Sequence, residues 1–280
     1  MTAGHGRRVR RPWLAGVVAG LVALMPPSWA GAAGRMPAEP GERPAAAPEI
    51  AIIIDDMGTR LDAGRRVIGL AGPVACAFLP YAPHTEALAR QAHGRGKEVM
   101  LHLPMATVEG RPLDRGALTL DMTEEELVAT LAADLARVPH AAGVNNHMGS
   151  LLTRHPGHML WLMRELRRRE GMFFVDSRTT RHTVAQLLAH ENAIPSVSRD
   201  VFLDDEPTAE GVAREFRRLL GLARRNGSAL AIGHPHPATL DLLERELPRL
   251  AGQGVKLVPI SRLVERQHER EHLWRASLSP

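Results

Sequence analysis

The stretch EIAIIIDDMG, Glu49–Gly58, places two adjacent aspartates and a glycine directly after six mostly apolar residues. The apolar run predicts a buried strand. Neighbouring side chains on a strand point to opposite faces, so Asp55 and Asp56 share one side only where the strand ends. Two carboxylates there repel each other unless a metal ion, an arginine or a shared proton relieves the repulsion. A helix N-cap would explain one aspartate and leave the second unexplained.

Short apolar runs alternate with longer amphipathic runs along the rest of the chain. This alternation requires parallel strand pairing, in either a (β/α) barrel or an open doubly wound sheet. The predicted strands are residues 49–55, 74–80, 98–104, 142–148, 172–177, 196–203, 228–235 and 256–260. The predicted helices are residues 60–70, 84–95, 123–138, 156–170, 183–190, 208–225 and 240–253.

Ionisable side chains occur at the C-terminal ends of five of these strands. Parallel α/β folds place their chemistry at this edge, because the loops there meet at one crevice. A barrel brings five strand ends within reach of a central point, whereas an open sheet spreads them apart. We therefore predict a (β/α) barrel over residues 49–265. The residues concerned are Asp55 with Asp56, His102, His147, Asp176, and His234 with His236.

Three of these residues form a sufficient ligand set for a catalytic metal ion. An aspartate and two histidines bind Zn²⁺, or another divalent ion, and leave a position open for water. Our predicted ligands are Asp56, His102 and His147. Taken singly, His102 fits a core histidine and His147 a loop-orienting residue. Asp55 would act as general base on a bound water whose pKa the metal lowers towards 7.

Five motifs, IDDMG, LHLPM, NNHMGS, VDSRT and GHPHPAT, occur in this order along the chain. The pattern resembles the NodB-like polysaccharide deacetylases, and more closely their divergent branch of exported bacterial proteins. The resemblance spans Glu49 to about Leu263 and implies a distorted seven-stranded barrel. It assigns the catalytic base to Asp55 and a metal ligand to Asp56.

The resemblance also suggests roles for later residues. His234 would be the general acid, and Asp176 would orient or charge-couple a site histidine with Arg178 as its partner. Side-chain chemistry adds candidate contacts to a sugar or an acetamide, with turn formation as the alternative for the two asparagines. The candidate substrate-binding residues are Asn145, Asn146, Arg178 and His236.

The chain departs from the superfamily pattern at its metal motifs. The second metal histidine of the superfamily comes four residues after the first, where this chain has Ala106. The arginine-containing motif of the fourth strand is replaced by residues 145–150. We expect His147, from this segment, to take the place of the missing ligand.

The N-terminus predicts export. A basic segment, an apolar run at residues 13–25 and small residues make residues 1–32 a signal peptide, with cleavage expected after Ala30 or Ala32. Residues 33–48 are rich in proline and alanine and predict a disordered linker. Residues 266–280 form a charged tail. We expect a periplasmic or secreted protein, with an uncleaved membrane anchor as the alternative.

The composition excludes several classes of partner. The formal net charge of +4 comes from four arginines of the signal segment, so the mature chain is close to neutral. It has no basic stripe of the kind that nucleic acid requires. Cys76 is the single cysteine, so no intrachain disulfide forms. No organic cofactor is expected.

Two functions are consistent with these residues. The first is a metal-dependent deacetylase acting on N-acetyl groups of a cell-envelope carbohydrate, either peptidoglycan or another polysaccharide. The second is a catalytically inactive deacetylase fold that binds envelope glycan or a cell-division protein. Ala106 favours the second function, and the predicted metal ligands favour the first.

Overall fold

A computed structural model describes residues 47–278 of the chain. The predicted signal peptide and all but the last two residues of the predicted linker therefore lie outside the described residues. Within the described part, no helix has both the length and the apolar character that a membrane span needs.

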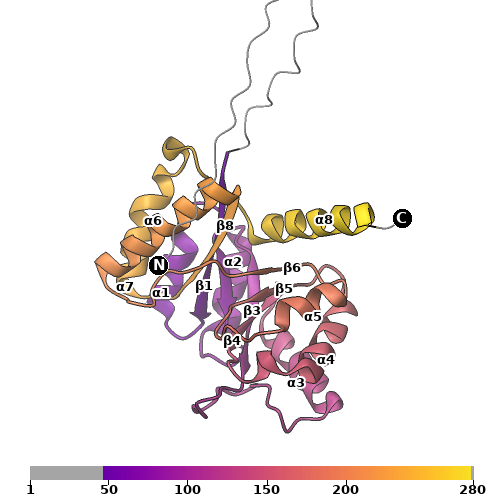
Figure 1. Cartoon of the computed structure of the whole chain (residues 1–280). Coiled ribbons are helices and arrows are strands. Elements are labelled where there is room, and N and C mark those ends of the chain that lie inside the picture. The colour runs from indigo at the N-terminus through magenta and orange to yellow at the C-terminus, as the bar shows by residue number, and fades with distance from the viewer. Residues whose placement is uncertain (1–46, 279–280) are drawn as a thin grey trace, which may run out of the picture. The chain divides into compact units, whose positions relative to one another are not determined.

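Eight parallel strands form one curved sheet, in the order β6-β5-β4-β3-β2-β1-β8-β7 (Figure 1). A ninth short strand pairs with the start of β1. The predicted (β/α) barrel is confirmed, with the site edge at the C-terminal ends of the strands. The strands are β1 Glu49–Met57, β2 Ala75–Phe78, β3 Val99–Met105, β4 Ala141–Met148, β5 Phe173–Asp176, β6 Ser196–Ser198, β7 Val201–Phe202, β8 Ser228–Gly233 and β9 Lys256–Leu257.

The predicted strand at residues 196–203 is divided into β6 and β7. These two strands lie at opposite ends of the sheet, although two residues join them. The Arg199 N–H bonds the Asp176 carbonyl of β5 at 3.0 Å, and the Asp200 N–H bonds the Leu230 carbonyl of β8 at 3.0 Å. One chain segment thus pairs with β5 at one edge of the sheet and with β8 at the other. The expected seven-stranded barrel therefore has an interrupted sixth strand.

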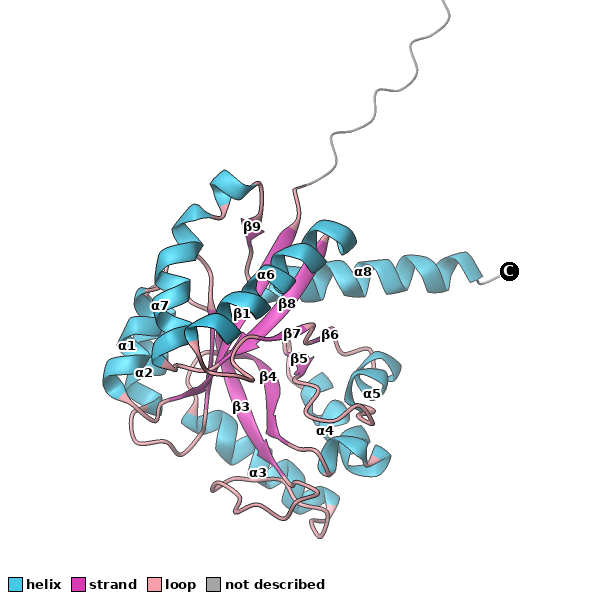
Figure 2. Cartoon of the chain, turned by 60° about the vertical axis from the view of Figure 1, so that its left-hand side comes forward, coloured by secondary structure: helices cyan, strands magenta, loops and turns pink. Residues whose placement is uncertain are grey.

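Helices cover the outer face of the sheet (Figure 2). The Thr123–Glu126 capping box begins α3, because the Thr123 hydroxyl accepts the Glu126 N–H and the Glu126 carboxylate accepts the Thr123 N–H. The helices are α1 Leu61–Gly69, α2 Thr85–Gly94, α3 Glu124–Arg137, α4 Pro156–Arg167, α5 Ala185–Glu191, α6 Ala209–Asn226, α7 Pro237–Glu246 and α8 Ile260–Leu278, with 3-10 turns at Leu152–Arg154, Leu247–Arg249 and Ala251–Gln253.

Side chains alternate between the two faces of the strands, except where a bulge interrupts the pairing. On β1, Ile50, Ile52 and Ile54 pack under the helices, whereas Ala51 and Ile53 pack in a separate cluster with inward residues of other strands. Because side chains alternate with period two, every second residue of a strand faces the barrel interior, up to the strand end at the site edge. This alternation decides which polar residues reach the barrel mouth.

The first half of α8 closes the opposite end of the barrel. Ile260, Leu263 and Val264 belong to the inward cluster. The buried carboxylate of Glu49, at the start of β1, accepts hydrogen bonds from Arg262 at 2.8 Å and also from Arg266. The residues expected as a charged tail from position 266 therefore continue α8 as far as Leu278.

Candidate metal centre

A bulge near the end of β1 brings both aspartates to the barrel mouth. Ile54 pairs with Cys76 and Met57 pairs with Phe78, so β1 has one residue more than β2 over this interval. Asp56 takes a left-handed backbone conformation, with φ of 53°. A bulge reorients the side chains that follow it. Asp55 keeps the inward direction of Ala51 and Ile53, and the bulge turns Asp56 to the same side.

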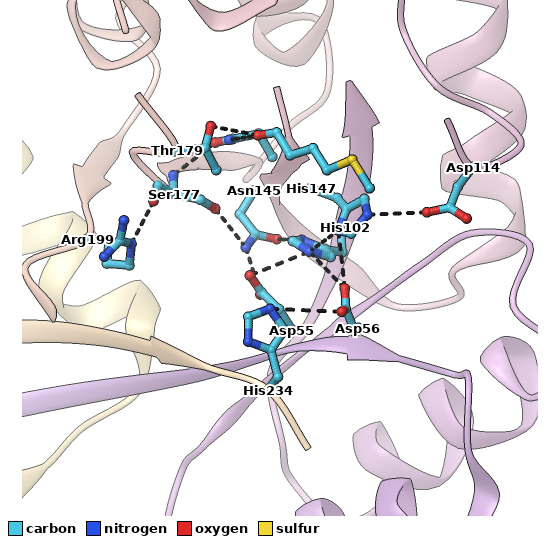
Figure 3. A network of polar contacts seen from close by, with 12 residues as sticks. Asp55, Asp56, His102, Asp114, Asn145, His147, Ser177, Thr179, Arg199 and His234 are labelled. Atoms are coloured by element: carbon cyan, nitrogen blue, oxygen red, sulfur yellow. Dashed lines mark hydrogen bonds and ion pairs between the residues drawn. The ribbon is translucent and has the colours of Figure 1, made fainter. Parts of the chain in front are cut away.

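Three side chains from the ends of β1, β3 and β4 meet at one point, and we call them the metal triad: Asp56, His102 and His147. Asp56 Oδ1 lies 3.4 Å from His102 Nε2 and 3.2 Å from His147 Nδ1. The two ring nitrogens are 3.0 Å apart. Figure 3 shows the three groups facing one another.

The metal triad fits a tetrahedral zinc ion. Ligand atoms about 2.0–2.2 Å from a tetrahedral Zn²⁺ are about 3.3 Å apart, which matches the three separations here. Asp56 Oδ1 is buried and makes no hydrogen bond of good geometry to any described residue. Burial by itself would raise the pKa of Asp56, but His102 and His147 outweigh it and lower that pKa. The carboxylate is therefore ionised, as a metal ligand must be.

A polar side chain lies beside each histidine of the triad. The buried Asn145 side chain, 0 % exposed, lies with Oδ1 3.0 Å from His102 Nδ1, so His102 presents Nε2 to the triad. Asp114, on the exposed loop after β3, has an oxygen 3.2 Å from His147 Nε2, which is within ion-pair distance but lacks good hydrogen-bond geometry. Carboxylate or amide partners of this kind fix the tautomer of a metal-binding histidine. Sequence reasoning missed Asp114, because no periodicity predicts where a long loop lies.

Asp55 lies beside the triad and lines the pocket. Its Oδ1 accepts a hydrogen bond from Asn145 Nδ2 at 2.8 Å, and its Oδ2 is 3.5 Å from His102 Nε2. Burial raises the pKa of Asp55, and the nearby His102 and His234 oppose that rise. A buried carboxylate next to a metal position is a suitable proton acceptor.

His234 follows β8 at the level of Asp55, because Ile54 pairs with Gly233. Its Nδ1 lies 3.0 Å from Asp204 Oδ1, which leaves Nε2 facing the site, 3.9 Å from Asp56 Oδ2. Burial opposes the charged form, but the bond to Asp204 and the charge of Asp55 raise the pKa of His234 to about 9. His234 is therefore protonated at neutral pH.

Asp204 orients His234, and so has the role that was predicted for Asp176. It also accepts the His234 backbone N–H at 2.6 Å and the Thr239 hydroxyl at 2.7 Å. Asp176 contacts no site histidine, so that expectation is wrong. The side chains of Val175 and Ser177 face inward, and alternation turns the intervening Asp176 towards α5.

Asp176 instead supports the loop after β5. Its carboxylate accepts the Arg178 N–H at 2.8 Å and the Thr183 hydroxyl at 2.9 Å. The expected pairing with Arg178 thus occurs through the backbone. Burial raises the pKa of Asp176 against these hydrogen bonds.

Two predicted substrate contacts need correction. The Asn145 amide is used entirely inside the protein, since Nδ2 also lies 3.2 Å from Ser177 Oγ, so it positions His102 and Asp55 instead of binding sugar. His236 is exposed at the start of α7 and does not line the pocket, although it approaches His234 with ring centres 5.7 Å apart. Asn146 and Arg178 do line the pocket, but the Asn146 amide is also used inside the protein, since it donates to the Met148 carbonyl and accepts the Ser177 N–H.

His102 and His147 of the triad, together with Asp55, line a pocket of about 450 Å³ at the strand ends. Its other walls come from the loops after β3, β5 and β7. A pocket of this size holds one or two sugar units or a similar ligand. The lining of these walls includes Glu109, Ser177, Arg178, Arg199, Phe202 and Asp205.

A second group of possible metal ligands, Asp204, His234 and His236, lies nearby. Both Asp204 oxygens already accept hydrogen bonds, and His234 Nδ1 is one of the donors. Both Asp204 oxygens and His234 Nδ1 are thus already used within the protein, so the metal triad is the better site.

Known proteins are similar to this chain over most of the described residues. The family model described as divergent polysaccharide deacetylase matches residues 52–264. The chain is 38% identical to the uncharacterized protein YibQ of Escherichia coli K12 over 221 residues, which cover 79% of this chain and 69% of YibQ. An uncharacterized protein of Haemophilus influenzae is 35% identical over 212 residues, 74% of this chain and 75% of that protein.

A solved structure shares the fold. The crystal structure of the uncharacterized protein ATU2773 from Agrobacterium tumefaciens aligns with a TM-score of 0.74 at 21% identity. The alignment covers 79% of this chain and 91% of that chain. At this identity the likeness concerns the fold alone.

Proposed function

The chain belongs to the divergent polysaccharide deacetylase family, and from this premise we propose that it is a metal-dependent deacetylase of a cell-envelope carbohydrate. The observation that carries the proposal is the metal triad, whose three separations of 3.0–3.4 Å suit one tetrahedral ion. The proposed substrate group is an N-acetyl group, and the proposed metal is Zn²⁺ or another divalent ion.

Asp55 and His234 divide the proton transfers between them. The metal, when bound, supplies a polarised acyl oxygen and an acidic water. Asp55 takes the proton from the attacking water, because its carboxylate faces the triad from a buried position. His234 gives a proton to the departing amine from Nε2, since Asp204 holds Nδ1.

The proposal also places the protein outside the cytoplasm. The signal-type segment at residues 1–32 supports this location, and a cell-envelope substrate would require it. Mass measurement on the native protein should find cleavage near Ala30–Ala32. An intact N-terminus in the membrane fraction would indicate an anchor instead.

Metal analysis tests the base of the proposal. The purified protein should contain about one Zn²⁺ or similar ion per chain, and Asp56→Ala, His102→Ala and His147→Ala should each remove it. The matched control is His155→Ala, since His155 is an exposed histidine outside the triad. A wild-type protein without metal, and without uptake of added Zn²⁺, would leave the glycan-binding alternative.

Acetate release tests the activity. The metal-loaded protein should release acetate from N-acetylglucosamine oligomers, and the Asp56→Ala variant should not. Bound metal without acetate release from neutral or acidic glycans would contradict the hydrolase function while leaving the metal site intact.

A further inference from the structure

Two arginines in the pocket wall have no acidic partner. Arg178 and Arg199, here called the arginine pair, both line the pocket. Among residues whose side chains are described, no carboxylate lies within ion-pair distance of either guanidinium. Unpaired arginines beside each other repel, so an anion between them would be stabilised.

The structure holds Arg199 in a fixed orientation. Its Nε donates to the Ser177 carbonyl at 2.6 Å and its Nη2 to the Arg178 carbonyl at 3.0 Å. The guanidinium lies 4.8 Å from the centre of the Phe202 ring. Figure 3 shows Arg199 beyond Ser177, on the side of the network away from Asp114. The remaining N–H groups are therefore positioned without being used by described residues.

Arg178 is held in place by its backbone. Its φ of 50° is left-handed, which is unfavourable for a residue with a Cβ. The buried Asp176 carboxylate stabilises this conformation by accepting the Arg178 N–H. The guanidinium makes no hydrogen bond to a described residue. The strained turn thus supports an exposed cation at the pocket wall.

Negative charge in the same pocket does not neutralise the arginine pair. Glu109 and Asp205 line the pocket but are exposed, and Glu109 accepts a hydrogen bond from Ser150 at 3.1 Å. The buried Asp55 and Asp176 and the exposed Asp205 attract Arg199, in this order of strength, but all three lie beyond ion-pair distance. Water and salt screen the exposed Glu109 and Asp205 strongly.

We propose that the arginine pair binds an anionic group, a carboxylate or a phosphate, on the same glycan whose N-acetyl group lies at the metal triad. Arginine recognises both groups by paired hydrogen bonds. The substrate class is therefore an acidic N-acetylated glycan. This inference rests on the proposed function, because that function places the N-acetyl group at the triad.

Calorimetric binding measurements with Asp55→Asn protein, in which substrate turnover should be slow, test the inference. The probes are chitotetraose, which is neutral, and a tetrasaccharide of alternating N-acetylglucosamine and N-acetylmuramic acid, which carries carboxylates. N-acetylglucosamine and its 6-phosphate form the phosphate pair. We expect about tenfold tighter binding of at least one acidic probe than of its neutral counterpart, with the preference falling as salt rises.

Substitutions test which residues cause the tighter binding of acidic probes. Arg178→Gln, which breaks no described side-chain bond, should reduce the acidic-to-neutral ratio of affinities about tenfold, whereas Arg178→Lys should retain part of it. Arg199→Lys, which also keeps the charge, is the second variant. Arg154→Gln, at an exposed arginine outside the pocket, is the control.

The outcomes separate the two proposals. Equal binding of acidic and neutral probes, or an unchanged ratio in Arg178→Gln, overturns the inference even if acetate is released. An arginine-dependent preference for acidic probes supports it, even if no hydrolysis occurs and the proposed function fails.

Discussion

Asp55 and Asp56 are neighbours in sequence, but the bulge in β1 gives them different surroundings. Asp55 receives a hydrogen bond from Asn145, whereas Asp56 Oδ1 has no hydrogen-bond partner of good geometry among the described residues. A carboxylate bound to a metal is too weak a base to serve also as proton acceptor. The two residues therefore have separate roles, ligand for Asp56 and base for Asp55.

Asn substitutions should separate these roles. Asp55→Asn should retain the metal and lower kcat by about 10² to 10⁴, the usual effect of removing a general base. Asp56→Asn should instead reduce the metal content. Metal analysis and steady-state kinetics on both variants provide the check. Equal metal loss in the two variants would mean that the aspartates bind the ion together.

Asp204 should act through His234. Asp204→Asn removes the charged acceptor of the His234 Nδ1 proton and should lower kcat by about 10- to 100-fold while metal content stays the same. Adding His234→Ala should then cause little further loss, because the two residues work as one unit. The comparison pair is Asp176→Asn with His234→Ala, whose effects should multiply. Multiplicative effects for Asp204 as well would contradict the coupling.

At the scale of elements, strand alternation explains which site residues were predictable. The inward-facing positions at the strand ends are occupied by Asp55, His102, His147 and His234. These side chains therefore meet at the barrel mouth. Asp176 lies between two inward-facing residues, so strand alternation predicts that its side chain faces away from the site. Asp204 follows the two-residue strand β7, which is too short to show any period.

Helix boundaries were predictable where a local signal existed. The capping box fixed the start of α3, and Gly227 ends α6 in the left-handed conformation, with φ of 82°. The division of residues 196–203 into two strands was not predictable, because it depends on hydrogen bonds to β5 and β8. Helix α8 was not predicted, because its sequence is dominated by charged residues.

Helix α3 carries a buried acid whose titration should weaken the fold at high pH. Asp134 is 0 % exposed, neither oxygen has a hydrogen bond of good geometry to a described residue, and burial raises its pKa to about 8. The folded state therefore favours the protonated form. Its contribution to stability is complete below about pH 4 and is lost as the pH rises to 8.

Asp134→Asn should therefore raise the melting temperature at pH 9 relative to wild type, and the difference should shrink towards pH 5. Thermal unfolding at both pH values measures this. The matched control on the same helix is Glu125→Gln, at an exposed position. A uniform loss of stability in Asp134→Asn at both pH values would show that the carboxylate is needed in its charged form.

For the whole domain, α8 and β1 join the two ends of the described sequence at the bottom of the barrel. Glu49 is buried, and its two arginine partners are half-exposed or exposed. Glu49→Gln should lower the free energy of unfolding by about 1 to 3 kcal/mol, through loss of charged hydrogen bonds. Chemical denaturation measures the change, and metal content should stay the same. The surface pair variant Glu86→Gln should change stability by less than about 1 kcal/mol.

The two residues between β6 and β7 have a consequence for chain connectivity. They join opposite ends of the hydrogen-bonded path, so the barrel is closed there by a two-residue connection and not by a strand ladder. A circular permutant opened between Arg199 and Asp200 would keep every strand pairing and lose only this closure. The stability of such a permutant would thus measure what a covalent junction contributes to a cylinder whose wall is otherwise held by backbone hydrogen bonds.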